Sequence, residues 1–387
     1  MTSRLATAKA VGAEIAAKHA GDVDARARFP EESFAALKKV KLLGIMVPKS
    51  EGGPGAEIAE VVSICHALGQ HCASTAMIYA MHQIQVSCVV RHAGTTKWQR
   101  DFMKRLHKEQ LLLASATSEA GVGGDVRSSI CAVEEKNGKF SLSKSATVIS
   151  YGDDSDGILV TARRTPESPA SDQVIVVVPK KGATLEKTEG WDTLGMRGTC
   201  SNGYHLKARG EMAQVIGTPY AEVSAQTMLP TSHLVWSALW LGIATGAMAR
   251  ARALVRTNAR KKPGAPPSPG AWRLAEASSL LQLMKSNVVA SLRQYEAALG
   301  SEDKLSALPF AVAMNNLKTG SSQMAVQVIN HALLICGLSG YRNDSPYSVG
   351  RHLRDAHSAA LMVNNDRILA NTANLLLALR EDGDLLA

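Results

Sequence analysis

The segment SEAGVGGD, residues 118–125, stands where the character of the sequence changes, and it decides how the chain divides. Before it, apolar residues such as Phe34, Leu37 and Val40 recur every three or four positions, which is typical of amphipathic helices. After it, short apolar and β-branched runs alternate with turn residues, and Asn137-Gly138 is typical of a two-residue hairpin turn. The glycines of the segment let its backbone N–H groups approach a planar ring or a phosphate closely.

Three regions follow from this pattern. Residues 1–108 predict a helical domain, which is interrupted at residues 47–55, where prolines and glycines require turns. Residues 109–218 predict a compact β-barrel or sandwich, and residues 219–387 predict a four-helix bundle. The expected fold class is therefore α+β multidomain, with an N-terminal helical domain, a middle β-barrel or sandwich and a C-terminal four-helix bundle.

The bundle is expected to contain four long helices with modest connections. The first two are marked by apolar residues from Leu234 to Ala249 and from Leu280 to Leu292. The third is expected from about Leu308 to Leu334 and the fourth from about Gly350 to Leu379. Proline and glycine between Lys261 and Gly270 predict an unstructured linker.

Charge and composition limit the possible partners. The chain has 387 residues, 45% of them hydrophobic, and a formal charge of +9, which suits a polyanion, a membrane surface, or a phosphate-bearing cofactor and substrate. The longest basic cluster, Arg260-Lys261-Lys262, has no interleaved aromatic residue and no nucleic-acid motif beside it, so we expect no nucleic-acid role. No segment is apolar enough for a signal peptide or a membrane span. The six cysteines have no metal-ligand spacing, so we expect reduced thiols, no metal site and a cytoplasmic protein.

Several motifs in order resemble the acyl-CoA dehydrogenase superfamily over roughly residues 29–380. They are FPEES at 29–33, LLGIMVP at 42–48, GGPG at 52–55, SEAGVGGD at 118–125, LGMRGT at 194–199, Gly340-Tyr341, and RHLRDA at 351–356. The resemblance implies a flavin enzyme that forms a homodimer or homotetramer, with FAD between the β region and the bundle. It also implies an acyl-CoA or other acyl thioester substrate and an electron-transfer flavoprotein as electron acceptor.

The same resemblance implies which residues contact the flavin. Ser118 and Ser150 stand where hydroxyl groups lie near the flavin ring, and such donors stabilise the negative charge of a reduced flavin. The other implied contacts are Gly123, Arg260, Gly337 and Asn365. The chain departs from the family at Gly124, where a serine is usual, at Val148, where an aromatic residue is common, and at Pro263, where a phenylalanine is usual.

The catalytic base of the family is missing. Family members use a glutamate to remove the proton α to the thioester carbonyl, and the two positions that carry it correspond to Val363 and Ser232 in this chain. The substitutes that the sequence offers are His233, Asp366 and His357, each of which has an ordinary structural role as its alternative.

This deficit leaves three hypotheses. The first is an FAD-dependent dehydrogenase of acyl thioesters. The second is a flavin-dependent monooxygenase of the same fold, using FMN or exchangeable reduced flavin from a flavin reductase, for which Ser118, Ser150 and Ser232 offer hydrogen-bond donors. The third is a non-catalytic protein that binds acyl thioesters.

Overall fold

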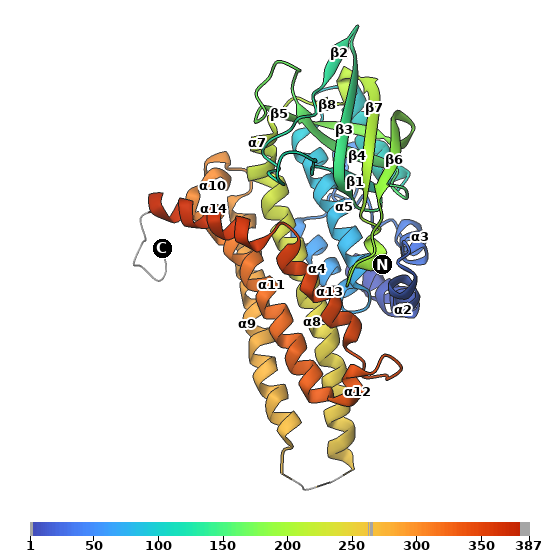
Figure 1. Cartoon of the computed structure of the whole chain (residues 1–387), viewed down its shortest axis with the longest axis vertical. Helices are drawn as coiled ribbons and strands as arrows, with labels where there is room; N and C mark the ends of the chain where they lie inside the picture. The colour runs from blue at the N-terminus through green and yellow to red at the C-terminus, as the bar shows by residue number, and fades with distance from the viewer. Residues whose placement is uncertain (1–2, 262, 264–265, 380–387) are drawn as a thin grey trace. The chain divides into compact units, whose positions relative to one another are not determined.

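The computed structural model describes residues 3–261, 263 and 266–379, and it divides into two compact units. The first unit comprises Met1–Ser232 and the second His233–Ala387. Figure 1 shows the elements of each unit with their labels. The predicted order of helices, then strands, then helices is confirmed.

The first unit begins with helices. They are α1 (Arg4–Ala10), a π-helical segment (Val11–Ala16), α2 (Ala17–Arg26), α3 (Glu31–Lys39), α4 (Ile58–Gly69), α5 (Ala73–His92) and α6 (Lys97–Lys108). The predicted interruption at residues 47–55 is confirmed, with one 3₁₀ turn at Lys49–Glu51. Gly53 is required there, because a Cβ atom would lie 2.1 Å from the carbonyl oxygen of Val47.

Two four-stranded sheets follow. The first has the order β1 (Leu113–Ala116), β4 (Gly157–Arg163), β5 (Gln173–Pro179) and β8 (Val215–Ile216), and the second has the order β2 (Glu134–Lys136), β3 (Lys139–Ile149), β7 (Asn202–Glu211) and β6 (Ala183–Glu189). The predicted hairpin between β2 and β3 is confirmed, since Asn137 and Gly138 have φ of 53° and 74°. The ladder between β3 and β7 is irregular between Ala146 and Ile149, which places a bulge at Thr147 and Val148.

The hydrophobic core of the first unit joins its helices to the first sheet. Val86 of α5 and Phe102 of α6 belong to one buried cluster with Leu113, Leu159 and Ile175 of β1, β4 and β5. Strands β4 and β5 are buried on both faces, which agrees with their continuous apolar sequences.

A short helix, α7 (Tyr220–Val223), and a π-helical segment (Ser224–Met228) lead into α8 (Leu229–Arg260), in which the boundary between the units falls. The second unit also contains α9 (Pro269–Ala298), α10 (Glu302–Ser306), α11 (Leu308–Cys336), α12 (Leu338–Tyr341), α13 (Gly350–Leu361) and α14 (Asn365–Ala378). Helix α11 packs against α9, α13 and α14.

Two predictions about the second unit need correction. The fourth helix is not continuous, because Val363 has a left-handed φ of 46° and the side chain of Asn364 caps a new helix by accepting from the Asp366 N–H at 2.7 Å. The predicted linker is shorter than expected, because Ser268 caps α9 and helix begins at Pro269. Residues 262, 264 and 265 of that linker lie outside the described residues.

A buried histidine joins three elements of the first unit. His82 of α5 is fully buried, its Nδ1 accepts from the Leu113 N–H at 3.0 Å, and its Nε2 lies 3.0 Å from the carbonyl oxygen of Leu43. Since a carbonyl only accepts, Nε2 carries the proton and the ring is neutral. Burial lowers the pKa of His82 from 6.5 to about 4.

We expect His82 to make the first unit sensitive to acid. Because its pKa is lower when folded, the unfolded chain binds the proton more tightly, so its stabilising contribution is complete above pH 6.5 and is lost as the pH falls toward 4. At pH 5 the loss from this residue is about 2 kcal/mol of unfolding free energy. Urea unfolding at pH 7 and pH 5 measures it. The variant His82→Gln should lose less stability between the two pH values than the unsubstituted protein, and equal losses would contradict the assignment.

Candidate functional site

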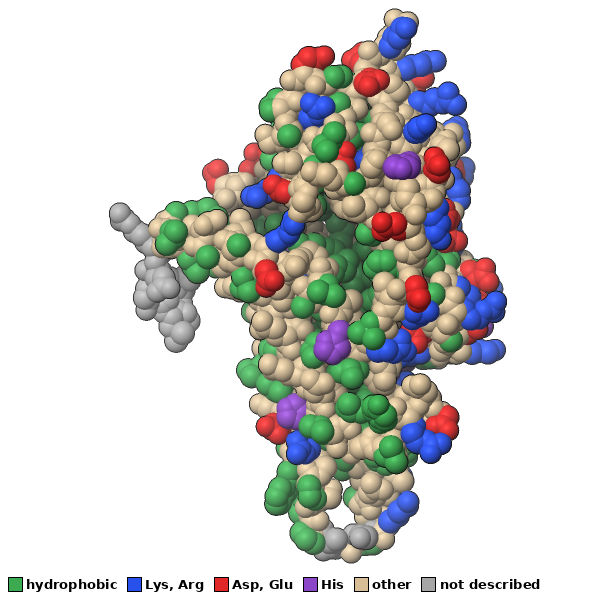
Figure 2. All heavy atoms as spheres, viewed as in Figure 1, with side chains coloured by type: hydrophobic (Ala, Val, Ile, Leu, Met, Phe, Trp, Pro, Cys, Tyr) green, Lys and Arg blue, Asp and Glu red, His purple; other side chains and the backbone are tan. Residues whose placement is uncertain are grey.

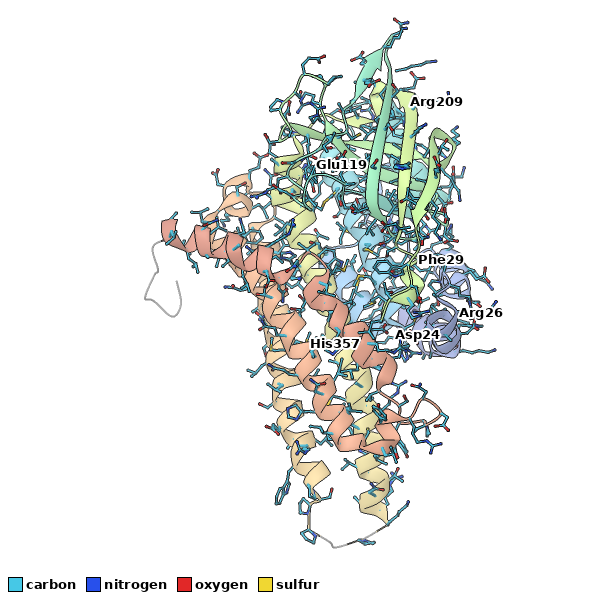
Figure 3. The ribbon with its side chains drawn as sticks, viewed as in Figure 1. Asp24, Arg26, Phe29, Glu119, Arg209 and His357 are labelled. Carbon is cyan, nitrogen blue, oxygen red and sulfur yellow. The ribbon has the colours of Figure 1, made fainter. Side chains whose placement is uncertain are left out.

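A buried carboxylate shapes the loop that follows Ser118. Glu119 accepts hydrogen bonds from the Ser129 hydroxyl at 2.7 Å, the Ile130 N–H at 3.1 Å and the Cys131 N–H at 2.8 Å. The ammonium group of Lys144 lies 3.5 Å from the same carboxylate, and both side chains are buried. Figure 3 shows Glu119 in the β region. The carboxylate therefore ties both ends of the loop to strand β3.

The glycines of this loop remain open to solvent. Gly121, Gly123 and Gly124 have positive φ of 90°, 58° and 77°, which side chains rarely adopt. All three are exposed, and a Cβ atom built on Gly123 would meet no atom within 4 Å. A planar group can therefore approach this backbone closely.

Ser118 is engaged within the β region. Its hydroxyl donates to the carbonyl of Val148 at 3.1 Å and accepts from the Val148 N–H at 3.2 Å. The single hydroxyl proton is therefore used on a backbone carbonyl, and Ser118 offers an outside group a lone pair of its oxygen. The same two bonds hold the bulge of β3, whose Val148 side chain is 37% exposed.

Ser150 lies at one end of a chain of hydroxyl groups. Its oxygen is 2.8 Å from that of Ser201, which is 2.7 Å from that of Thr199, and Thr199 donates to the carbonyl of Met196 at 2.9 Å. Because each hydroxyl has one proton, Ser201 then donates to Thr199 and Ser150 donates to Ser201. If all three protons turn the other way, Ser150 becomes a donor toward an outside group. Ser150 can thus form a hydrogen bond with either a donor or an acceptor.

These two serines are brought together by neighbouring elements. Ser118 follows β1, Ser150 follows β3, and Val148 links them through the bonds described above. Gly123 lies in the loop that starts at Ser118. The structure therefore brings Ser118 and Ser150 to one end of β3, where the glycine loop begins.

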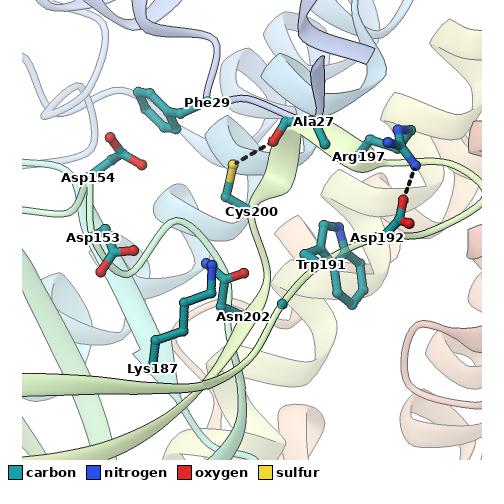
Figure 4. Close-up of a pocket in the computed structure, with 11 residues that line it drawn as sticks. Ala27, Phe29, Asp153, Asp154, Lys187, Trp191, Asp192, Arg197, Cys200 and Asn202 are labelled. Carbon is teal, nitrogen blue, oxygen red and sulfur yellow. Dashed lines mark hydrogen bonds and ion pairs between the residues drawn. The ribbon is translucent and has the colours of Figure 1, made fainter. Parts of the chain in front are cut away.

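The first unit also has a cavity of about 860 Å³, whose lining residues Cys200 and Asn202 flank Ser201, the partner of Ser150. Phe29, Asp154, Trp191 and Cys200 are among its lining residues, and Figure 4 shows them around it. Neither serine nor any loop glycine lines it. Burial and the neighbouring Asp153 raise the pKa of Asp154.

Neither of the two positions at which the sequence resemblance predicts the family base carries a proton acceptor in the structure. Ser232 is buried and donates to the carbonyl of Leu229 at 2.7 Å. Val363 lies in the break between α13 and α14, where its side chain is 48% exposed. Its backbone has the left-handed conformation that strongly disfavours a β-branched residue.

The three substitutes differ in environment. His233 is buried in the second unit, and its Nδ1 donates to the carbonyl of Met314 at 2.9 Å, which leaves Nε2 with a lone pair. Burial lowers the pKa of His233 to about 4, so it is a weak base. Asp366, in the first turn of α14, and His357, on α13 in Figure 3, are both exposed.

The remaining implied flavin contacts are Gly337, Asn365 and Arg260. Gly337 ends α11 with φ of 54° and ψ of −138°, a conformation that only glycine adopts readily. Asn365 is buried, and both ends of its amide are bonded to Lys318 and Ser322. Arg260 is exposed at the end of α8.

Sequence reasoning missed Lys318, which is buried beside Val363. Its Nζ donates to the Val363 carbonyl at 2.8 Å and to Asn365 Oδ1 at 2.7 Å. A signal was present, because Lys318 interrupts the buried apolar face formed by Met314, Leu317 and Ala325 on α11.

Among the described residues, no cluster of histidine, cysteine, aspartate or glutamate could hold a metal ion. Within the residues that the structure describes, one helical stretch, Tyr220–Arg260, is long and apolar enough to cross a membrane. Because 83% of its most apolar window is buried, it has the character of a core helix.

Known proteins match this chain along most of its length. The model "Acyl-CoA dehydrogenase, N-terminal domain" matches residues 4–139, and "Acyl-CoA dehydrogenase, C-terminal domain" matches residues 234–366. A probable acyl-CoA dehydrogenase of Mycobacterium leprae, fadE25, is 28% identical over 368 residues, which cover 94% of this chain and 91% of the relative.

Two solved structures share the fold. Dibenzothiophene monooxygenase (TdsC) from Paenibacillus sp. A11-2 has a TM-score of 0.80 at 19% identity, covering 97% of this chain and 98% of that one. Butyryl-CoA dehydrogenase from Megasphaera elsdenii has a TM-score of 0.77 at 21% identity, covering 96% and 97%. The predicted fold class is thereby confirmed as one that a dehydrogenase and a monooxygenase share. The chain belongs to the acyl-CoA dehydrogenase family.

Proposed function

We propose that this protein is a flavin-dependent oxidoreductase that works without the glutamate of its family. The observation that carries this proposal is the grouping of an exposed glycine loop with Ser118 and Ser150 at one end of β3. These groups fit a flavin, because the open backbone at Gly123 accommodates a planar ring and Ser150 can donate or accept. When bound, FAD supplies the two-electron chemistry that amino-acid side chains lack.

The chain's own residues have separate tasks in this proposal. The loop at Gly123 and the hydroxyls of Ser118 and Ser150 bind and orient the cofactor from the first unit. Gly337, Asn365 and Arg260 are the proposed contacts from the second unit. The hydroxyl chain behind Ser150 adjusts its proton order to the group in front of it.

The reaction that family membership favours is α,β-dehydrogenation of an acyl thioester. Members of this family carry that activity in their names, as in the relative from Mycobacterium leprae. Among the three candidates, His233 is the most suitable substitute base, because Nε2 of its neutral tautomer carries a lone pair. An electron-transfer flavoprotein would then be the electron acceptor.

A second reaction, flavin-dependent monooxygenation, is favoured by one specific observation. Val363 and Ser232 leave both positions of the family base without a proton acceptor, and oxygenation needs no such base. TdsC, which shares the fold, is named a monooxygenase and has an FMN-bound structure. In this case the cofactor would be FMN or reduced flavin delivered by a flavin reductase.

An anaerobic visible spectrum of the purified protein separates these reactions. We expect bound flavin, which is bleached when a short or medium acyl-CoA thioester is added. If no thioester bleaches the flavin, but oxygen and a flavin reductase together convert an added substrate to a hydroxylated product, monooxygenation is supported instead. A protein that binds thioesters without any flavin would be a binding protein and would overturn both.

We infer further that the protein works in the cytoplasm as a homodimer or homotetramer. The second unit exposes large apolar side chains, including Trp272 of α9, Leu338 and Tyr341 of α12, and Leu377 of α14. Figure 2 shows hydrophobic side chains along α14. A second copy of the chain is the occupant that this surface fits, and light scattering measures the resulting mass.

A further inference from the structure

Lys318 of α11 is buried without a carboxylate partner. Its side chain has no exposed surface, and among the described residues no acidic group acts on it as a charge partner. Its neighbours are the Val363 carbonyl at 2.8 Å, Asn365 Oδ1 at 2.7 Å and the Trp240 ring, whose centroid is 5.8 Å away. An ammonium group in such a place costs free energy, which its neutral partners offset only in part. The buried ammonium group of Lys318 therefore calls for a structural or functional explanation.

The two oxygen atoms that Lys318 binds belong to the break between α13 and α14. Val363, at its centre, has a φ of 46°, which is strained for a β-branched residue. Such a conformation persists only where surrounding contacts impose it. The contacts of this turn are those of Lys318 and the cap that Asn364 gives to α14.

Further hydrogen bonds connect the turn to α11. The amide nitrogen of Asn365 donates to the Ser322 hydroxyl at 3.0 Å, and Ser322 donates to the carbonyl of Thr319 at 2.7 Å. Lys318 and Ser322 are one helical turn apart, so they lie on the same face of α11. Two side chains of one rigid helix thus hold one short turn.

The direction of these bonds determines what the turn exposes. The carbonyl of Val363 and the side-chain oxygen of Asn365 point inward to Lys318, while the Val363 side chain is half exposed. The strained backbone thereby leaves the side chain of residue 363 accessible.

We propose that Lys318 is a positioning residue that locks the turn of residues 362–365 and so presents residue 363 and Asn365 at a fixed place. The part that concerns the cofactor rests on the proposed function, because Asn365 is a proposed flavin contact. The lock itself concerns the second unit alone and does not depend on any ligand.

Substitution at Lys318 tests the lock by hydrogen exchange. We expect Lys318→Met to speed amide exchange in a peptide that covers residues 362–368 by at least tenfold, since the turn loses both bonds to the lysine. Ser322→Ala should speed it less, because only the outer bond to Asn365 is removed. Lys318→Arg, which keeps the charge and the donors, should restore at least part of the protection.

Val328→Ala is the matched control for a general loss of stability. Val328 is fully buried on the same helix, and removing its two methyl groups weakens the core without touching the turn. We expect a lower melting temperature and unchanged exchange at residues 362–368. If Val328→Ala speeds that exchange as much as Lys318→Met does, or if Lys318→Met does not speed it, the lock is refuted.

Flavin titration of the same variants tests the cofactor part. We expect Lys318→Met to weaken flavin binding by about tenfold, Lys318→Arg to recover most of the loss, and Val328→Ala to bind as the unsubstituted protein does. If exchange rises but flavin affinity stays the same, the lock stands and its role toward the cofactor is refuted. If the unsubstituted protein binds no flavin, the proposed function fails, and the exchange experiment still decides the lock.

Discussion

Replacing Glu119 by glutamine is expected to lower the free energy of unfolding by about 3 kcal/mol, because it leaves the buried ammonium of Lys144 without its partner. The amide also turns one acceptor into a donor, although Ser129, Ile130 and Cys131 all donate to the carboxylate. An unpaired charge in the interior and a donor that faces donors both destabilise the folded state. Urea unfolding followed by circular dichroism measures the loss.

A double-mutant cycle separates the ion pair from the other bonds of Glu119. Lys144→Met alone should cost less, because the carboxylate keeps its three hydrogen-bond donors. In the background of Lys144→Met, Glu119→Gln should cost at least about 1 kcal/mol less than it does alone. The control Glu134→Gln, on the exposed strand β2, should change stability by less than about 0.5 kcal/mol. Additive losses in the cycle would show that the two side chains are not coupled.

The same substitution bears on function, because Glu119 holds the loop with the exposed glycines. We expect Glu119→Gln to speed proteolysis at residues 120–128 as well, since the two ends of that loop are tied to the carboxylate. The sequence motif at residues 118–125 does not indicate any role for Glu119. In the structure, its carboxylate holds the two ends of the loop together.

Elements with a local cause were predictable from the sequence. The hairpin at Asn137-Gly138 needs two residues that tolerate positive φ, and the turns at residues 47–55 need proline and glycine. Strands β4 and β5 have continuous apolar sequences because both faces are buried. The order of the motifs indicated the family, and their spacing predicts that Val363 stands at the position of the family base.

Features that depend on distant residues were not predictable. The apolar pattern continues through residues 350–379, so it predicts one helix, while the break at Val363 depends on Lys318, 45 positions earlier. Likewise, the residue type of Ser118 indicates a donor, but its proton is used on the carbonyl of Val148, 30 positions later. The environment of His233 also comes from another helix, through Met314. In each case a long-range contact overrides what the local sequence indicates.

Placing glutamate at Val363 is expected to raise the rate at which an acyl-CoA thioester bleaches the bound flavin by about 10²-fold or more. We infer that this position corresponds to the family base, and the nearest side chains in sequence that could accept a proton, Asp366 and His357, are exposed. A carboxylate here would accept the α-proton of the thioester. Glutamate is not β-branched, so it should adopt the left-handed backbone of this turn at a lower cost than valine does. Stopped-flow absorbance under anaerobic conditions measures the rate.

Val363→Gln is the matched control, because glutamine has the size and flexibility of glutamate but does not accept a proton. A gain with glutamate and none with glutamine would show that thioester and flavin already meet at this turn and that proton removal limits the native reaction. If neither variant changes the rate, proton removal at residue 363 is refuted, and if no acyl thioester bleaches the flavin of either variant or of the unsubstituted protein, dehydrogenation of acyl thioesters is refuted as the activity of this chain. The loss of the family base would then be understood as the mark of a different reaction, in which the flavin reacts with oxygen and residue 363 serves only to shape the turn.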